Sequence, residues 1–186
     1  EAVLEMLQRF SEDLTALQLR WFDRWLSGKG GEPNREAPVK IFVQGANRWR
    51  DESDWPLARA VETPLFLAGG GGLLNAPEPQ TSPQSFLYDP ANPCPTMGGP
   101  ILMPPTYRRG PVNQRVWLER TDVLAFTSDP LDADVEVTGP VQAILHAATT
   151  GRDTDWVVKL CDVHPDGATI SVCDGVLRAR FRDSFD

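Results

Sequence analysis

The sequence is poor in the residues that most often carry enzyme chemistry. It has two histidines and three cysteines in 186 residues. No serine lies in a Gly-x-Ser-x-Gly pattern, the turn that carries the nucleophile of α/β hydrolases. The cysteines form no Cys-x-x-Cys pair, so neither a zinc site nor a redox motif is indicated. We expect Cys94, Cys161 and Cys173 to be small buried thiols, and a Cys161–Cys173 bridge is the alternative in an oxidising compartment.

Long apolar runs and an excess of positive charge are also missing. No stretch approaches the roughly 20 apolar residues that cross a bilayer. Eighteen Lys and Arg against 26 Asp and Glu give a net charge of -8, which disfavours binding to nucleic acid phosphates. The chain starts at Glu1 with no signal-peptide pattern. We therefore expect neither a membrane nor a nucleic-acid partner, and a cytoplasmic location, with secretion as the alternative.

Residues 2–26 predict one amphipathic helix. Leucine and tryptophan recur at three- and four-residue spacing, as at Leu14, Leu17, Trp21 and Trp25. The glycine-rich segment that follows is typical of a helix C-terminus. Because the apolar stripe is too large to remain in water, we expect it to pack against a sheet or another chain. The chain begins inside this helix, so we expect it to be a piece of a longer protein.

Seventeen prolines and fifteen glycines predict many turns and a mostly β structure after this helix. His164-Pro165-Asp166-Gly167 is typical of a hairpin turn. The expected strands are 39–43, 63–68, 116–118, 123–127, 141–149, 156–163, 169–173 and 176–181. Short strands at such intervals favour a sandwich or jelly roll. Only six of these strands follow residue 113, whereas a jelly roll has about eight. The fold class expected here is therefore an incomplete jelly-roll β-sandwich, truncated at its C-terminus.

Two further segments are read as loops. The glycines at 69–72 are not followed by Gly-Lys-Ser/Thr, so we interpret them as a flexible turn rather than a phosphate-binding loop. Residues 76–109 are rich in proline but contain apolar groups at 86–88 and 101–103. Such a long structured loop is often functional or covers another domain.

The remaining candidates for chemistry have plainer explanations. His146 and His164 lack a third ligand at a telling spacing, so we interpret both as solvated or hydrogen-bonded histidines. Turns and hairpin ends collect aspartate for hydrogen bonding alone, which explains the possible carboxylate pairs Asp153 with Asp155 and Asp162 with Asp174. Trp49, Trp55 and Trp156 could stack on sugars in a carbohydrate-binding jelly roll, but packing between domains is the plainer role.

A set of short motifs spans nearly the whole chain in a fixed order. They are WFDRWL at 21–26, VQGANRWRDE at 43–52, DWP at 54–56, YDP at 88–90, PCPTMGG at 93–99, GPVNQR at 110–115, DVL at 122–124, VEVTGP at 135–140, DTD at 153–155, DVHPDG at 162–167, CDG at 173–175 and RAR at 178–180. In this order they resemble the CocE/NonD (cocaine esterase-like) family of serine hydrolases. That family is related to X-Pro dipeptidyl peptidases and α-amino-acid ester hydrolases.

The resemblance implies a domain organisation and a function. Residues 1–61 would be the C-terminal end of an α/β-hydrolase domain, with helix 2–26, strand 39–43 and linker 44–61. Residues 62–186 would form the jelly roll. The family's catalytic Ser, His and Asp would lie upstream, so we expect this chain to carry no catalytic residue, no metal and no cofactor. Its expected partners would be the rest of the hydrolase domain and a small ester or amide substrate, with a homo-oligomer as a further option.

The resemblance also implies one contribution to a substrate pocket. In this family a Leu-Phe pair in the loop after the Thr-x-Gly-Gly motif lines the pocket, and the matching positions are Leu102 and Met103. Methionine replaces the aromatic residue here; it is adaptable and has no ring face for stacking. The stiff prolines around the pair exclude a central strand. We therefore expect it to face the hydrolase active site, with burial in the jelly-roll core as the alternative.

The most favoured function is thus the C-terminal part of a serine esterase or acyl hydrolase. The alternative from another class is a jelly-roll binding module for carbohydrate or protein.

Overall fold

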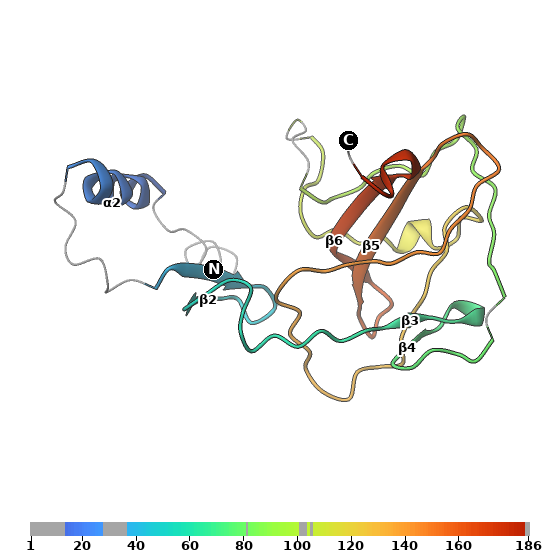
Figure 1. Ribbon diagram of the computed structural model, residues 1–186, viewed down its shortest axis with the longest axis horizontal. Helices are drawn as coiled ribbons and strands as arrows, with labels where there is room; N and C mark the ends of the chain where they lie inside the picture. Colours follow the sequence, from blue (N-terminus) through green and yellow to red (C-terminus); the bar gives the residue numbers. More distant parts are fainter. Residues whose placement is uncertain (1–13, 28–36, 81, 101–103, 105, 185–186) are drawn as a thin grey trace. The chain divides into compact units, whose positions relative to one another are not determined.

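The computed structural model describes residues 14–27, 37–80, 82–100, 104 and 106–184. The chain divides into two compact units (Figure 1). Unit 1 consists of Glu1–Glu62 with Glu136–Val141, and unit 2 of Thr63–Val135 with Gln142–Asp186.

Unit 1 contains helix α2 (Leu14–Leu26) and the antiparallel strands β1 (Val39–Val43) and β2 (Arg48–Glu52). The helix and β1 agree with the predicted positions, although residues 2–13 of the predicted helix lie outside the described residues. The second strand was not predicted, because residues 44–61 were read as a linker. Gly45 and Asn47 take positive φ angles of 82° and 51°, which glycine and asparagine tolerate best. These residues reverse the chain and create the hairpin.

The apolar stripe of α2 is exposed. Leu17, Trp21 and Trp25 are 41%, 56% and 65% exposed. The ring of Trp21 contacts those of Phe22 and Trp25, with centroid distances of 5.2 and 6.4 Å. These contacts lie within the helix itself. The expected packing partner for the stripe is therefore not found among the described residues.

The described part of unit 2 contains two pairs of antiparallel strands. The short strands β3 (Phe66–Leu67) and β4 (Leu73–Leu74) pair across the 3₁₀ turn η1 (Gly69–Gly71). The longer strands β5 (Asp155–Val163) and β6 (Thr169–Arg178) form an antiparallel hairpin, followed by the 3₁₀ turn η3 (Ala179–Phe181). Together with the β1–β2 pair, these make three two-stranded antiparallel sheets in the described part of the chain.

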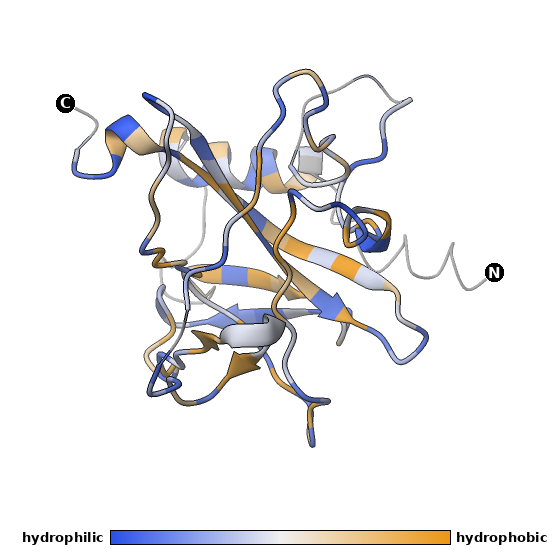
Figure 2. Cartoon of the chain, turned by 90° about the vertical axis from the view of Figure 1, so that its right-hand side faces the viewer, coloured by the Kyte–Doolittle hydropathy of each residue, from blue (hydrophilic) through white to orange (hydrophobic). Residues whose placement is uncertain are grey.

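The β5–β6 hairpin confirms the predicted turn at 164–167. The His164 amide donates to the Ala168 carbonyl and the Gly167 amide to the His164 carbonyl, both at 2.8 Å. Gly167 has a φ of 80°, the conformation for which glycine is suited. In Figure 2 some strands are mainly hydrophobic and others carry hydrophilic stretches, and hydrophilic residues gather at several of the turns. The predicted strands 169–173 and 176–181 are one strand that ends at Arg178.

Three other predicted strands are wrong. Residues 115–117 form the 3₁₀ turn η2 (Arg115–Trp117) instead of a strand at 116–118. Residues 123–127 contribute only an isolated bridge from Thr127 to Gly72, and residues 141–149 have no strand structure. An alternating pattern tells which side chains share a face, but a strand also needs a partner for its backbone groups. The described residues thus form a mostly β chain with one α-helix and three two-stranded antiparallel sheets.

The apolar core of the described residues is small, and several of the most buried side chains are polar. Leu57, Ala68 and Val112 are the buried apolar residues. The buried polar side chains belong to Glu52 in unit 1 and to Gln114, Thr169 and Ser171 in unit 2. Since buried polar groups stabilise a fold only when they are hydrogen-bonded, these residues identify where the structure is most tightly specified.

The three cysteines are free thiols rather than a bridge, and they are less buried than predicted. Cys94 is exposed, whereas Cys161 and Cys173 are half-buried. A β-bulge changes the pairing register between Leu160 and Cys161. Leu160 pairs with Cys173 and Cys161 pairs with Ser171, so the two cysteines are not directly opposite each other. Burial raises the pKa of the Cys161 thiol above its usual value. This thiol is therefore poorly ionised at neutral pH.

Asn113 ties the segment before η2 to β6 and provides a test of this fold. Its Oδ1 accepts hydrogen bonds from the amides of Arg115 and Thr169, both at 3.0 Å. Asn113→Ala removes both, and we expect it to lower the free energy of unfolding by about 1 kcal/mol. Asn113→Asp keeps an acceptor at the same place and should cost less. Urea unfolding of both variants measures the difference, and equal losses would contradict this role for Oδ1.

Candidate functional site

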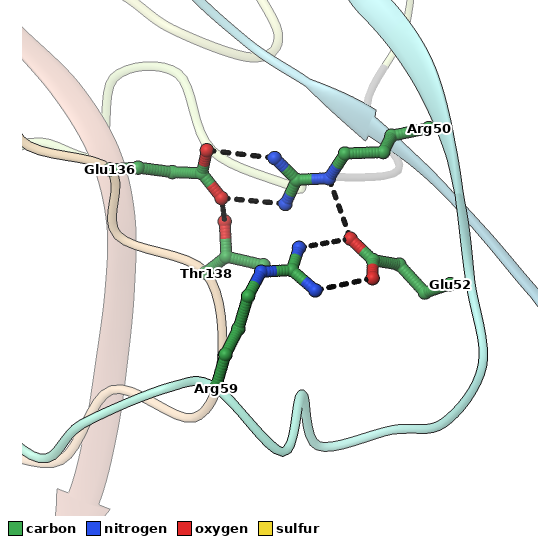
Figure 3. Close-up of polar contacts among 5 residues, drawn as sticks. All are labelled: Arg50, Glu52, Arg59, Glu136 and Thr138. Atoms are coloured by element: carbon green, nitrogen blue, oxygen red, sulfur yellow. Dashed lines mark hydrogen bonds and ion pairs between the residues drawn. The ribbon is translucent and has the colours of Figure 1, made fainter.

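Four charged side chains form a hydrogen-bonded network in unit 1 (Figure 3). Arg50 of β2 donates through both terminal nitrogens to Glu136, at 2.6 and 2.8 Å, and through Nε to Glu52 at 2.6 Å. Arg59 also donates two hydrogen bonds to Glu52. The hydroxyl of Thr138 donates to Glu136 at 2.8 Å. The network therefore holds segment 136–141 against the β1–β2 hairpin.

Both carboxylates of this network are strongly stabilised as anions. The bonds from Arg59 and then Arg50 lower the pKa of Glu52 to about 2, although its side chain is only 6% exposed and burial acts in the opposite direction. The bonds from Arg50 and Thr138 lower the pKa of Glu136 to about 2. Carboxylates with such low pKa values are poor proton acceptors near neutral pH. The network is thus suited to holding structure rather than to acid–base catalysis.

The two glutamates should make unit 1 sensitive to acid. Their folded-state pKa values lie below the ordinary value of 4.5, so the stability they contribute is present above that value and is lost as the pH falls toward 2. We expect the free energy of unfolding to decrease across this window. Glu136→Gln should flatten the decrease, because it removes one of the two titrating groups.

A double-mutant cycle can isolate the interaction of Arg50 with Glu136. We expect a larger coupling free energy for Arg50→Gln with Glu136→Gln than for the control cycle Arg178→Gln with Asp155→Asn. Arg178 and Asp155 are also bidentate, at 2.7 and 2.9 Å. The carboxylates of the two pairs are similarly exposed, but Arg178 is 47% exposed, whereas Arg50 is 22% exposed and is also held by Glu52. Exposed pairs contribute little. Equal coupling in the two cycles would contradict the importance of the network.

The second organised polar cluster, in unit 2, closes the base of a loop. Gly99 and Gly110 exchange two backbone hydrogen bonds, at 3.0 and 3.1 Å, so that residues 100–109 form a loop with its ends tied together. The side-chain amide of Gln114 donates to the carbonyls of Met97 at 2.9 Å and Val112 at 3.2 Å. We call these five residues the loop base. Gln114 is 3% exposed.

The loop base is fixed to β6 from the other side. The Ser171 amide and hydroxyl donate to the Val112 carbonyl, at 3.1 and 3.2 Å, and the Ser171 hydroxyl lies 3.1 Å from the Val112 amide nitrogen. The amide of Gln114 donates to the Thr169 carbonyl at 2.7 Å. The motifs at 93–99 and 110–115 therefore contact each other, and the second motif also contacts the first residues of β6. The sequence motifs do not distinguish Gln114 from its neighbours. Its burial, at 3% exposure, is what identifies it in the structure.

The predicted pocket residues Leu102 and Met103 lie outside the described residues. The structure describes their neighbours Pro100 and Pro104, which are exposed. It also describes the loop base, which determines where the loop begins and ends. The expectation that the pair lines a substrate pocket thus remains a prediction.

The carboxylate pairs and histidines considered from the sequence lie in separate surroundings in the part of the chain that the structure describes. Asp153 and Asp155 each bind an arginine, Arg180 and Arg178 respectively. The Nε2 of His164 lies 3.2 Å from Asp162 on the exposed hairpin end, and His146 is exposed. The described residues contain no group of three or more His, Cys, Asp or Glu side chains that could hold a metal ion.

The tryptophans considered for sugar stacking have different surroundings. The ring of Trp49 packs edge-on against Phe42, with centroids 5.3 Å apart, and lies under the Lys40 ammonium. Trp55 is 47% exposed, and Trp156 is half-buried on β5. Packing within the hairpin thus accounts for Trp49.

The family model for the X-Pro dipeptidyl-peptidase C-terminal non-catalytic domain matches residues 32–186. The chain belongs to this family. Over 182 aligned residues it is 40% identical to cocaine esterase from Rhodococcus sp. (strain MB1 Bresler). The alignment covers 93% of this chain and 32% of the esterase. Its structure is similar to an aminopeptidase from the marine sediment archaeon Thaumarchaeota archaeon, with a TM-score of 0.63 and 26% identity over 89% of this chain and 30% of the aminopeptidase. The family resemblance inferred from the ordered motifs is thereby confirmed.

The chain spans about a third of the length of these two relatives. It corresponds to a domain that the family description calls non-catalytic, in agreement with the lack of a Gly-x-Ser-x-Gly motif. Among the described residues, no helix is long and apolar enough to cross a membrane.

Proposed function

We propose that this chain is the C-terminal, non-catalytic part of a serine esterase that cleaves ester bonds in small molecules, with amide bonds as the alternative substrate class. The observation that carries the proposal is the 40% identity to cocaine esterase over 93% of the chain. The chemistry would be that of a Ser-His-Asp triad outside this sequence. There the serine attacks the carbonyl, the histidine accepts its proton and the aspartate orients the histidine.

The proposed domain organisation follows from the same similarity. Residues 1–61 would complete an α/β-hydrolase domain, and residues 62–186 would form most of a jelly-roll β-sandwich. The exposed Trp21 and Trp25 of α2 support this organisation, because such large apolar side chains favour contact with another surface. The preceding part of the hydrolase domain would provide that surface.

The proposed contribution to substrate binding is the loop closed by Gly99 and Gly110. Leu102 and Met103 on this loop would line the acyl side of the pocket at the domain interface, where ligand pockets are commonly found. Methionine would accommodate acyl groups of varied shape, since its side chain is flexible and polarisable.

The first test separates this chain from the enzyme that would contain it. We expect no hydrolysis of p-nitrophenyl butyrate above background by the 186-residue chain, because it has no nucleophile elbow. The full-length protein should hydrolyse the ester and lose activity when its elbow serine is changed to alanine. Turnover by the chain that disappears on mutating one of its own serines would contradict the proposal.

The second test concerns Met103. In the full-length protein, Met103→Ala should change KM or the preference between short and bulky acyl esters, with little effect on thermal stability. One methylene group more or less in an apolar pocket changes the discrimination between substrates by about 10–200-fold. Unchanged kinetics with a large loss of thermal stability would instead place Met103 in an ordinary core.

A further inference from the structure

The charged network of unit 1 lies where the chain leaves this unit and where it returns. The chain leaves unit 1 after Glu62, and residues 63–135 belong to unit 2 before the chain re-enters unit 1 at Glu136. Arg59 lies shortly before the exit, and Glu136 is the first residue after the return. The network therefore contains one member from each end of the 63–135 segment.

The four charges connect these two ends in alternating order (Figure 3). Arg59 donates to both carboxylate oxygens of Glu52, which also accepts from Nε of Arg50. The two terminal nitrogens of Arg50 donate to Glu136. Without Glu136, two arginines would share one carboxylate, and the terminal nitrogens of Arg50 would present a fork that matches a carboxylate. The returning chain supplies that carboxylate.

The two carboxylates differ in exposure, which indicates which link is easier to break. Glu52 is 6% exposed and is held by both arginines. Removing the partners of a buried charge is costly, so the bonds of Glu52 belong to the permanent part of the network. Glu136 is 46% exposed, and salt screens interactions between charges that water can reach. The Arg50–Glu136 link is thus the more easily broken one.

A second tie joins the outgoing and returning parts of the 63–135 segment. The Leu73 amide donates to the Thr127 carbonyl at 3.0 Å, and the Thr127 amide donates to the Gly71 carbonyl at 2.8 Å. These bonds surround the isolated parallel bridge between Gly72 and Thr127. The two backbones approach closely, because a Cβ on Gly71 would lie 3.0 Å from the Ala125 carbonyl oxygen. So short a pairing depends on whatever else keeps the two parts of the chain together.

We propose that the network is an electrostatic clasp, which closes the 63–135 segment at its base and thereby stabilises the Gly72–Thr127 bridge within it. Closing a loop costs conformational entropy that increases with the length of the loop. When the clasp is formed, the bridge closes only the short stretches between itself and the clasp. When the clasp is open, the bridge must close the whole chain between residues 72 and 127. The inference does not rest on the proposed function.

The test uses the full-length protein with Glu136→Gln, which removes the charge of the more exposed carboxylate and keeps the length of its side chain. Asp155→Asn is the matched control. Asp155 is 44% exposed and pairs with Arg178 through two hydrogen bonds, as Glu136 does with Arg50. The control pair lies within the β5–β6 hairpin and does not connect the ends of the 63–135 segment.

The measurement is amide hydrogen exchange, followed by mass spectrometry on peptides that contain Leu73 or Thr127. We expect exchange of these two amides to become roughly three- to fivefold faster in Glu136→Gln, because the loop that the bridge must close becomes longer. The amides of His164 and Gly167, which are bonded in the hairpin turn, provide the reference and should not change. The control variant should leave Leu73 and Thr127 unchanged.

Salt provides a second, independent way to open the clasp. At about 1 M salt the screening length falls to about 3 Å, so the Arg50–Glu136 attraction weakens without any substitution. In the unmodified protein, exchange at Leu73 and Thr127 should then become faster relative to the reference amides. In Glu136→Gln the same amides should no longer respond to salt, because the link has already been removed.

Each outcome decides for or against the clasp. Equal exchange at Leu73 and Thr127 in Glu136→Gln and the unmodified protein would overturn it. Equal acceleration at His164 and Gly167 would overturn it as well, because the loss of stability would then be global. If Glu136→Gln does not fold, the salt titration of the unmodified protein decides: selective acceleration supports the clasp, and its absence overturns it. Because no substrate is used, the result is independent of whether the proposed esterase function holds.

Discussion

The hydrogen bonding of residues 112–114 along the start of β6 is the interaction on which the arrangement of unit 2 depends. Backbone bonds join Gln114 to Thr169 and Val112 to Ser171, and the Asn113 side chain adds a further bond to the Thr169 amide. These bonds connect segments more than 50 residues apart in sequence. They connect the β5–β6 hairpin with the segment that follows the Gly99–Gly110 pair.

Polar contacts dominate the described structure because its apolar core is small. Among the residues that the structure describes, three apolar residues are buried, whereas Trp25, Val157 and Val176 are at least 60% exposed. In other domains the apolar core determines which segments lie together. Here the ion network of unit 1 and the loop base of unit 2 do much of this. Such networks stabilise one arrangement because each unsatisfied member would be costly. This organisation is consistent with a domain that completes its packing against further protein.

The same polar contacts bear on how a non-catalytic domain could influence catalysis. A loop fixed at both ends by the fold is a precise way to present side chains to a neighbouring site, since the positions of its ends are no longer free to vary. The charged network around Glu52 serves a different purpose, because low pKa values make its carboxylates structural anions over the physiological range.

The sequence alone determined the features that depend on local chemistry. The turn at 164–167 follows from proline and glycine preferences, strand 39–43 from its apolar run, and the helix ending at Leu26 from leucine and tryptophan spacing followed by glycine. The ordered motifs also identified the family. Each of these signals lies within a short window of residues, where local conformational preferences act directly.

Only the tertiary structure decided which segments pair. The patterns at 123–127 and 141–149 resemble strands but have no strand partner in the described residues, whereas residues 48–52, which looked like a linker, pair with β1. The bonds from Arg50 to Glu136 and from Gln114 to Met97 join residues 86 and 17 positions apart. No local preference of arginine or glutamine selects such partners. Their choice depends on how the chain brings distant groups together and removes them from water, because burial is what makes a polar partner necessary.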